Sequence, residues 1–332
     1  MTSQRLMVVD AHNQFLRSYI VDPSLSSHGQ PIGGCKGFLK ILNKLTREIK
    51  PDAIVVVWDG EGGSQKRRAV NKNYKQGRKP LRLNRQARNL TDVEEKQNKA
   101  WQQIRAVEYL NCTPVIQFME PLVEADDVIS YVVNHKAYEE YQKIIVSSDK
   151  DFFQLLDDST ILYRPTQSEV LNKFAVLEKF AIHPCNFALA RAMVGDTSDN
   201  LPGVRGVGLT TAARRFPQLA SDESVTLDGL FDYCEKKTEE PGWPATYEKI
   251  LQDRDLVSEN YKIMQLYSPT MSIQCKQKIT HTIEHHEAEF NKTALRAAMH
   301  KDGVGEVSLN SLFECFNRAT ALFPLPKEEK VC

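Results

Sequence analysis

Three short runs of apolar, mostly β-branched residues each lead into an aspartate. They are residues 6–10 (LMVVD), 53–59 (AIVVVWD) and 144–149 (IIVSSD). Continuous apolar runs of this length are typical of parallel strands that are covered on both faces. Segments with helical periodicity alternate with them, at residues 37–49, at residues 100–110 and from about Glu124 onward. The alternation predicts an α/β fold with a mostly parallel, doubly wound central sheet.

Acidic residues gather at the ends of these predicted elements. In doubly wound sheets, ligands bind beyond the carboxyl ends of the strands. Nine acids in five groups lie at or near one such edge: Asp10, Asp59, Glu124, Asp126, Asp127, Asp149, Asp151, Asp196 and Asp199. Like charges this close together repel and raise each other's pKa, so their convergence requires divalent cations. Because Mg²⁺ takes oxygen ligands and keeps several waters, we predict a two-ion, magnesium-dependent phosphodiester hydrolase.

Single groups of these acids also have ordinary structural explanations. Glu124 and Asp127 are three residues apart and would share one face of a helix. Acids in a first turn favour the helix dipole, and Asp149 could simply begin a turn. The metal-site prediction therefore depends on the joint appearance of all the groups, which packing and solvation alone do not require.

The formal net charge of zero hides a strongly basic segment. The chain has 43 Lys and Arg against 43 Asp and Glu, yet residues 66–88 contain ten basic residues and no acid. We predict that this segment lies over the acidic site and handles single-stranded nucleic acid. Tyr74 would stack a base, while Lys75 and Arg78 would neutralise phosphates. The alternative is a solvated, mobile loop.

A glycine-rich turn separates two predicted helical segments in the second half of the chain. It comprises Gly203, Val204, Arg205, Gly206, Val207 and Gly208. Its backbone N–H groups, with the start of the following helix, could hold a DNA phosphate without reading sequence. The alternative is a helix connector that merely needs glycine. Helical patterns at residues 174–194, after residue 208, and at residues 247–267 and 292–299 predict a mainly helical second domain.

Cysteine usage and hydropathy indicate a compartment. The seven cysteines are an odd number with no metal-ligand spacing, which is typical of reduced thiols in a cytosolic protein. No signal segment precedes the first strand, and no apolar run approaches the roughly 18 residues that span a bilayer. We therefore expect a cytoplasmic protein without a membrane partner.

Taken together, these motifs resemble the flap endonuclease (5′-nuclease) superfamily, above all bacteriophage 5′→3′ exonucleases and the nuclease domain of bacterial DNA polymerase I. The resemblance runs from about residue 7 to about residue 290. It is carried by residues 8–10 (VVD), 58–60 (WDG), 74–78 (YKQGR), 124–127 (EADD), 148–152 (SDKDF) and 195–200 (GDTSDN). It implies a PIN-like or Rossmann-like core over residues 1–180 with a helical arch at about 64–110. A helical domain would span residues 181–332, with a DNA-binding helix–hairpin–helix motif at about 186–220.

The resemblance also implies roles for individual residues. The first metal ion would be held by Asp10, Asp59, Glu124 and Asp126, and the second by Asp149, Asp151 and Asp199. Asp127 and Asp196 would be supporting acids of the metal site. Arg67, Lys75 and Arg78 would lie in the arch that a 5′ single strand passes through, with Lys75 and Arg78 acting in catalysis. Residues 203–208 would grip duplex DNA, often with a bound K⁺. Ala11 stands where relatives usually carry glycine, and we expect a shifted backbone there with activity retained.

By this resemblance the protein would be a 5′→3′ exonuclease and flap endonuclease that leaves a 5′-phosphate and a 3′-hydroxyl. Mg²⁺ would be the metal, with Mn²⁺ able to replace it. Flapped, gapped or nicked DNA would be the substrate. The resemblance does not decide between DNA and RNA·DNA hybrids as substrates. We expect a monomer that meets replication proteins, and, because no polymerase domain follows, a stand-alone phage nuclease that acts in replication, primer removal and repair in the host cytoplasm. The rival hypotheses are a non-catalytic DNA-binding paralogue, a phage nuclease of the RNase H type, and an unrelated α/β phosphatase.

Overall fold

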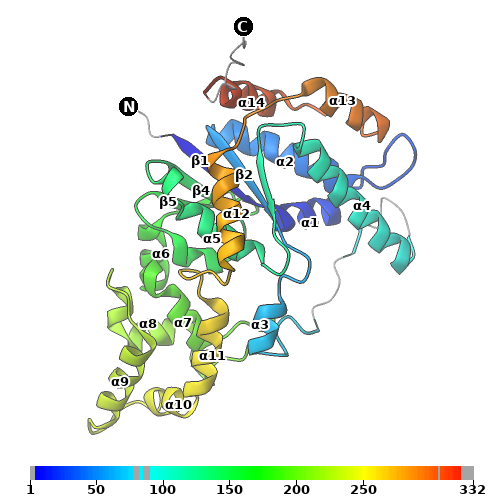
Figure 1. Cartoon of the computed structure of the whole chain (residues 1–332). Coiled ribbons are helices and arrows are strands. Elements are labelled where there is room, and N and C mark those ends of the chain that lie inside the picture. Colours follow the sequence, from blue (N-terminus) through cyan, green and yellow to red (C-terminus); the bar gives the residue numbers. More distant parts are fainter. Residues whose placement is uncertain (1–3, 78–81, 85–89, 306, 323–332) are drawn as a thin grey trace.

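The described residues form a six-stranded sheet at the centre of the molecule (Figure 1). This computed structural model describes residues 4–77, 82–84, 90–305 and 307–322. The strands, in the spatial order β3-β2-β1-β4-β5-β6, are β1 (Arg5–Asp10), β2 (Ala53–Trp58), β3 (Ile116–Met119), β4 (Gln142–Val146), β5 (Thr160–Arg164) and β6 (Glu169–Leu171). All neighbouring pairs are parallel except β5 with β6. The predicted α/β fold with a mostly parallel sheet is confirmed.

The apolar strand residues are divided between two hydrophobic clusters, one on each face of the sheet. In β1, Leu6 and Val8 belong to one cluster, and Met7 and Val9 to the other. Helix α5 (Ala125–Val133) contributes to the first cluster. The second is built with α1 (Ala11–Val21), α2 (Gly33–Ile49) and α4 (Asp92–Leu110). Both faces are covered, which explains why the strand sequences are continuously apolar and do not alternate with polar residues.

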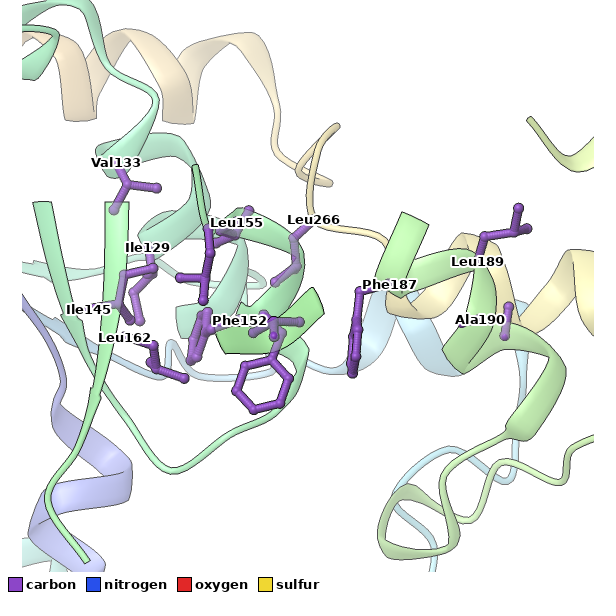
Figure 2. Packing of buried hydrophobic residues seen from close by; sticks show 14 of the residues in the cluster. Ile129, Val133, Ile145, Phe152, Leu155, Leu162, Phe187, Leu189, Ala190 and Leu266 are labelled. Atoms are coloured by element: carbon purple, nitrogen blue, oxygen red, sulfur yellow. The ribbon is translucent and has the colours of Figure 1, made fainter. Parts of the chain in front are cut away.

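The first cluster continues from the sheet into the helical part of the chain. Figure 2 shows Ile145 and Leu162 at the sheet end of this packing, with Phe152 and Phe187 between them and Leu189. The short helix η2 (Asp151–Leu155) lies between β4 and β5. The sheet is followed by α6 (Lys173–Phe180), α7 (Phe187–Val194), η4 (Thr197–Asp199), α8 (Leu209–Arg215), α9 (Leu227–Thr238), α10 (Thr246–Gln252) and α11 (Arg254–Met264). A shared core therefore joins the helices around the glycine-rich turn to the sheet.

Two of the predicted helical segments are each broken into two helices. The segment at residues 174–194 stops at Phe180, because Ala181 takes a left-handed conformation with φ 53°. Pro184, which lacks an amide hydrogen, then begins a short 3₁₀ turn before α7. The segment at residues 247–267 is divided at Asp253 between α10 and α11.

The last helices return to the sheet. They are α12 (Ile273–Glu284), α13 (Lys292–Lys301) and α14 (Asn310–Leu322), and in Figure 1 the last two lie beside α2 and α4. Leu295, Leu312 and Phe316 belong to the same hydrophobic cluster as α1 and α2. The domain boundary at residue 180 stays a prediction, and these three helices pack on the α/β layer.

The segment predicted to form an arch, at about residues 64–110, contains α3 (Gln65–Val70) and α4, and the arch itself stays a prediction. Residues 78–81 and 85–89 of this segment, Arg78 included, lie outside the described residues. No helix in the described part of the chain has the length and the apolar composition needed to cross a bilayer.

Candidate active site at the carboxyl edge of the sheet

A cleft of about 460 Å³ opens where the strand order reverses, beyond the carboxyl ends of β1 and β4. Six of the nine predicted acids line it: Asp10, Asp59, Asp126, Asp149, Asp151 and Asp199. They come from the end of β1, the residue after β2, the first turn of α5, the segment after β4, and η4. Ligands bind at this position in doubly wound sheets, so these side chains lie where the sheet topology favours a functional site.

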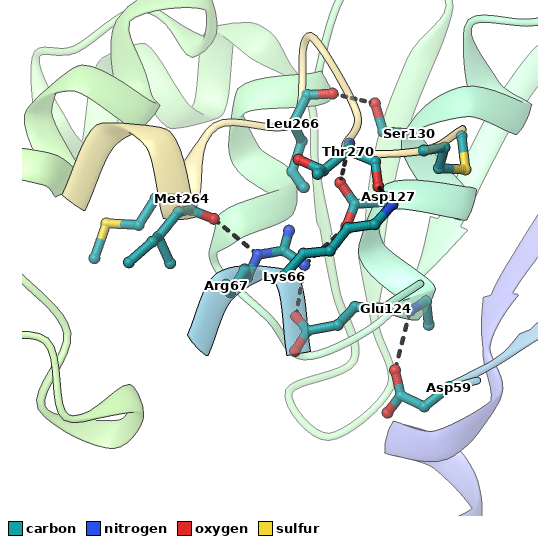
Figure 3. Close-up of polar contacts among 12 residues, drawn as sticks. Asp59, Lys66, Arg67, Glu124, Asp127, Ser130, Met264, Leu266 and Thr270 are labelled. Atoms are coloured by element: carbon teal, nitrogen blue, oxygen red, sulfur yellow. Dashed lines mark hydrogen bonds and ion pairs between the residues drawn. The ribbon is translucent and has the colours of Figure 1, made fainter. Parts of the chain in front are cut away.

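Hydrogen bonds from backbone amides and from a serine hydroxyl orient the carboxylates of the cleft. Asp10 caps α1, with Oδ1 accepting from the amide of Asn13 at 3.1 Å, and its Oδ2 accepts from Ser147 Oγ at 2.8 Å. Asp59 Oδ1 accepts from the amide of Ala125 at 3.0 Å, and so fixes the start of α5 from the neighbouring strand (Figure 3). These contacts hold acids from different strands in defined positions.

The electrostatics of the cleft show a deficit of positive charge. Burial raises the pKa of Asp10 to about 7, with a smaller contribution from the charges of Asp59 and Asp149 and against the hydrogen bond from Ser147. Burial, followed by repulsion from Asp149, raises the pKa of Asp126 well above its usual range. A bound cation would relieve both the desolvation and the repulsion.

Arg67 is buried beneath the cleft and binds two acids at the start of α5, the N-cap residue Glu124 and Asp127 in the first turn (Figure 3). Its Nη1 lies 2.7 Å from Glu124 Oε2 and 2.8 Å from Asp127 Oδ2, and its Nε donates to the carbonyl of Ile263 at 2.9 Å. The predicted shared face of Glu124 and Asp127 is confirmed, because one guanidinium bonds both. The side chain is only 7% exposed and is occupied by these partners, so the predicted DNA contact of Arg67 gains no support from this structure and stays a prediction. Arg67 therefore joins α3 to the start of α5 and to the last turn of α11.

Tyr74 and Lys75 also converge on Glu124. Tyr74 is 3% exposed, packs with Leu201 and Met264, and donates its hydroxyl hydrogen to Glu124 Oε2 at 3.1 Å. A ring buried in this way has no free face for a base, so the stacking role gains no support from this structure and stays a prediction. Lys75 Nζ lies 2.8 Å from Glu124 Oε1, and the side chain also lines the cleft. Glu124 is thus neutralised by protein cations.

The two predicted supporting acids are fully engaged by protein donors. Asp127 Oδ1 accepts from the amide of Thr270 at 2.9 Å, while its Oδ2 takes Arg67. Asp196 accepts from the amide and the hydroxyl of Ser198, both at 2.7 Å, and binds Arg191 through Oδ2. Both acids therefore orient neighbouring chain segments.

Arg191 is a residue that the sequence analysis missed. Its Nε also donates to Asp151 Oδ1 at 3.2 Å, so one guanidinium links η2 to the chain before η4. The available signal was a lone arginine inside the apolar helix sequence at residues 187–194 (FALARAMV).

The glycine-rich turn links α7 and α8. A Cβ on Gly203 would lie 2.0 Å from the carbonyl oxygen of Val194, and Gly206 has φ +85°, so both positions require glycine. Val204 and Val207 are buried, and their amides donate to Met193 and to Val204 within the fold. These two amides are engaged within the fold, and the DNA-binding role of the turn stays a prediction. The exposed residues of the turn are Arg205, Gly206 and Gly208.

The donor set of the cleft suits a hard, hydrated cation. Across the described ranges, no group of three or more His, Cys, Asp or Glu side chains is arranged to hold a metal ion as it stands. Mg²⁺ is usually bound through one or two carboxylates and keeps several waters, so it does not require such a group. The six carboxylates of the lining are hard oxygen ligands and therefore suit a hydrated divalent cation.

Comparison with known proteins identifies the family. The model of the 5′-3′ exonuclease N-terminal resolvase-like domain matches residues 5–181. A 5′-3′ exonuclease of Aquifex aeolicus is 30% identical over 226 residues, which cover 66% of this chain and 71% of that protein. The thermostable DNA polymerase I of Thermus aquaticus is 30% identical over 254 residues, which cover 76% of this chain and 27% of the polymerase. The chain thus spans about a quarter of the polymerase.

Solved structures show the same fold. The D15 protein of bacteriophage T5, co-crystallised with metal ions, has a TM-score of 0.63 and 17% identity over 90% of this chain and 98% of that one. The complex of the T5 D15 flap endonuclease with DNA and metal ions also gives 0.63, over 95% of this chain and 100% of that one. Together with the matched family model, which covers the sheet and its acidic edge, these findings show that the chain belongs to the 5′–3′ exonuclease family of nucleases.

Proposed function

We propose that this chain is a structure-specific 5′-nuclease, which hydrolyses phosphodiesters of branched or 5′-ended DNA. The observation that carries the proposal is the cleft lined by six aspartates at the carboxyl edge of the sheet. Membership of a nuclease family makes a phosphodiester the expected substrate. The T5 flap endonuclease that shares the fold was crystallised with DNA and metal ions, which supports the same ligands here.

The acids would hold two divalent cations, Mg²⁺ in the first place. Asp10, Asp59 and Asp126 would hold one, joined by Glu124 when Lys75 turns from its carboxylate to the substrate, and Asp149, Asp151 and Asp199 would hold the other. When bound, the cations would supply an activated water and neutralise charge at the scissile phosphate. The raised pKa values of Asp10 and Asp151, both about 7 and both due first to burial, support a site that gains from added positive charge.

Lys75 is the protein cation best placed to act on the phosphate. It lines the cleft and also binds Glu124, so it can turn between the acid and a substrate. A cation aimed at charge that develops in the transition state lowers the barrier more than it strengthens binding. Arg78, three residues further on, keeps its proposed catalytic role as a prediction because it lies outside the described residues.

Duplex DNA would be held through the glycine-rich turn between α7 and α8, in the manner of a helix–hairpin–helix motif. Arg205 is exposed there beside Gly206 and Gly208, so the turn offers a cation and a backbone that a phosphate can approach closely. A K⁺ ion at this turn is part of the proposal. Contacts of this kind select the shape of the substrate and leave its base sequence unread.

The biological setting that we propose is phage DNA replication, with removal of flaps or RNA primers that leaves a 5′-phosphate and a 3′-hydroxyl. The test is incubation with a 5′-labelled flap duplex in Mg²⁺ or in EDTA, followed by sizing of the products and ligation of the shortened strand. A short single strand released only with Mg²⁺, and a ligatable 5′-phosphate, are expected. DNA and RNA flaps compared side by side decide the primer preference. Binding without cleavage would overturn the proposal.

A further inference from the structure

Arg17 is a second positively charged residue, besides Lys75, that lines the cleft. Lys75 is paired with Glu124 at 2.8 Å. Arg17 donates from Nη1 to the hydroxyl oxygen of Thr166, and within the described ranges it has no ion pair with an acid. A guanidinium bonded to a neutral hydroxyl, in a cleft lined by six aspartates, is available to an incoming anion.

Helix α1 places this cation away from the acids but on the same wall of the cleft. Asp10 caps α1, and Asn13 and Arg17 follow at spacings that keep them on one face of the helix. All three line the cleft. The seven residues from Asp10 to Arg17 correspond to about 10 Å along the helix axis. Arg17 therefore lies beyond the acid cluster, where it would meet a neighbouring phosphate and not the one between the acids.

Two hydroxyl groups complete the surroundings of Arg17. Thr166 lies in the turn between β5 and β6, and its Oγ1 is 3.2 Å from Oγ of Ser148, the residue before Asp149. Both side chains line the cleft. Three separate segments thus bring a guanidinium and two hydroxyls into one connected group. Hydroxyls rotate to donate, and the planar fork of arginine matches phosphate oxygens.

We propose that Arg17, Ser148 and Thr166 form a phosphate-binding subsite of the cleft, which holds the substrate strand next to the scissile bond. The proposal rests on the function proposed above and adds to it the residues that position the strand. The ligand is a phosphate of the nucleic acid, either internal or at the 5′ end. The aspartates repel a phosphate unless cations are bound between them. A phosphate of the incoming strand would therefore be held first at the subsite.

The competing explanation is structural. The hydrogen bond between Arg17 and Thr166 would then only tie the β5–β6 turn to α1, and its removal would lower stability without changing how the protein responds to salt. A cation that binds phosphate differs, because its removal reduces the dependence of log Kd on log salt by about 0.7 to 0.9.

The test compares Arg17→Gln with Arg47→Gln, which makes the same chemical change at an exposed arginine near the opposite edge of the sheet. Binding of a fluorescent flap duplex is measured over a range of KCl, with Ca²⁺ in place of Mg²⁺. Arg17→Gln should bind about tenfold more weakly at low salt, with a slope reduced by about 0.7 to 0.9. Arg47→Gln should match wild type. Equal slopes in the two variants, with a lower melting temperature for Arg17→Gln, would leave only the structural tie.

Two further variants keep the test independent of folding. Arg17→Lys retains the charge but not the fork, so the salt slope should stay while binding weakens. Thr166→Val removes only a hydroxyl and should weaken binding in the same direction as Arg17→Gln. An affinity unchanged in both variants would count against the subsite.

Substrates with a recessed 5′ end distinguish the two sources of phosphate. If Arg17→Gln slows cleavage only when the end carries a phosphate, the subsite takes the terminal phosphate. If it slows phosphorylated and hydroxyl ends equally, the subsite takes an internal phosphate. No slowing on either substrate would overturn the proposal. Wild-type protein that binds with the full salt slope but cleaves nothing would instead refute the proposed nuclease function, and the subsite would still stand on its binding data.

Discussion

Replacement of Arg67 by methionine tests the buried network beneath the cleft. Methionine has a similar reach and fills much of the space, but it supplies neither charge nor hydrogen bonds. The substitution removes bonds to Glu124 at 2.7 Å and Asp127 at 2.8 Å, and one to the carbonyl of Ile263 at 2.9 Å. The two carboxylates are only 3% and 2% exposed, so water cannot replace the missing guanidinium.

The expected cost follows from what each carboxylate retains. Glu124 keeps Lys75 and the hydroxyl of Tyr74, whereas Asp127 keeps the amide of Thr270 and loses its ion pair. Removal of one partner from a buried ion pair costs about 3–5 kcal/mol, because a charge is left buried and unpaired. That is a large part of the roughly 5–15 kcal/mol by which domains are stable.

Urea unfolding measures this cost, with Arg68→Met as the matched control at the exposed neighbouring position. The control should change the free energy of unfolding by less than about 0.5 kcal/mol. Arg67→Lys should fall between the two, since an ammonium can satisfy one acid but not both. If Arg67→Met costs no more than Arg68→Met, the network does not hold the structure together.

DNA binding by the same variants separates a buried anchor from a phosphate-binding residue. If Arg67 bound a phosphate directly, its replacement by methionine would reduce the salt slope of binding by about 0.9. We expect no such reduction, because Arg67 is buried. A reduced slope in a folded Arg67→Met protein would mean that this side chain reaches the DNA after all.

Three other substitutions test separate parts of the account. Asp10→Asn should stabilise the metal-free protein at pH 8 by roughly 1–4 kcal/mol, because burial raises the folded-state pKa of Asp10 to about 7 while the unfolded value is about 3.9. Between these two pKa values the folded state binds more protons than the unfolded state, so the stability of the wild-type protein falls as pH rises through this range. Urea unfolding in EDTA measures the effect at pH 4 and at pH 8. An equal gain in the free energy of unfolding at both pH values would contradict the raised pKa of Asp10. Gly203→Ala should destabilise the protein by at least about 1–3 kcal/mol, because the new methyl group would lie 2.0 Å from the carbonyl oxygen of Val194. In the control Gly208→Ala the methyl group meets nothing within 4 Å, so the loss of stability, measured by thermal unfolding, should be less than about 1 kcal/mol. Equal losses of stability in the two variants would show that the backbone around Gly203 can move to accommodate a methyl group. Lys75→Ala should lower the single-turnover cleavage rate about 100-fold with a smaller change in affinity, and an effect confined to affinity would exclude its role in the transition state.

The strands and their acidic edge could be predicted from the sequence because the signals are local. A continuous apolar run specifies a strand covered on both faces, and the parallel arrangement then brings Asp10, Asp59 and the residues after β4 to the same edge. The shared face of Glu124 and Asp127 also follows from helical periodicity alone. Strands β3, β5 and β6 are short and contain polar residues, so they gave no comparable signal.

The environment of individual charges could not be predicted in the same way. Arg67 lies in a run of cations, which favours exposure, yet tertiary packing brings it against two acids 57 and 60 residues away. Arg17 looks like an ordinary arginine of an amphipathic helix, and only the position of the β5–β6 turn gives it a place in the cleft. The return of α13 and α14 to the sheet likewise depends on contacts that periodicity does not encode.

The central claim is that the aspartates of the cleft carry out phosphodiester cleavage, and Asp149→Asn tests it most directly. Asp149 is exposed, and its Oδ1 accepts from the amide of Asp151 at 2.9 Å, a bond that asparagine can keep. Flap binding and single-turnover cleavage in Mg²⁺ are measured on both proteins. We expect nearly unchanged binding with loss of most of the cleavage. Cleavage at the wild-type rate would remove Asp149 from the active site and contradict the claim.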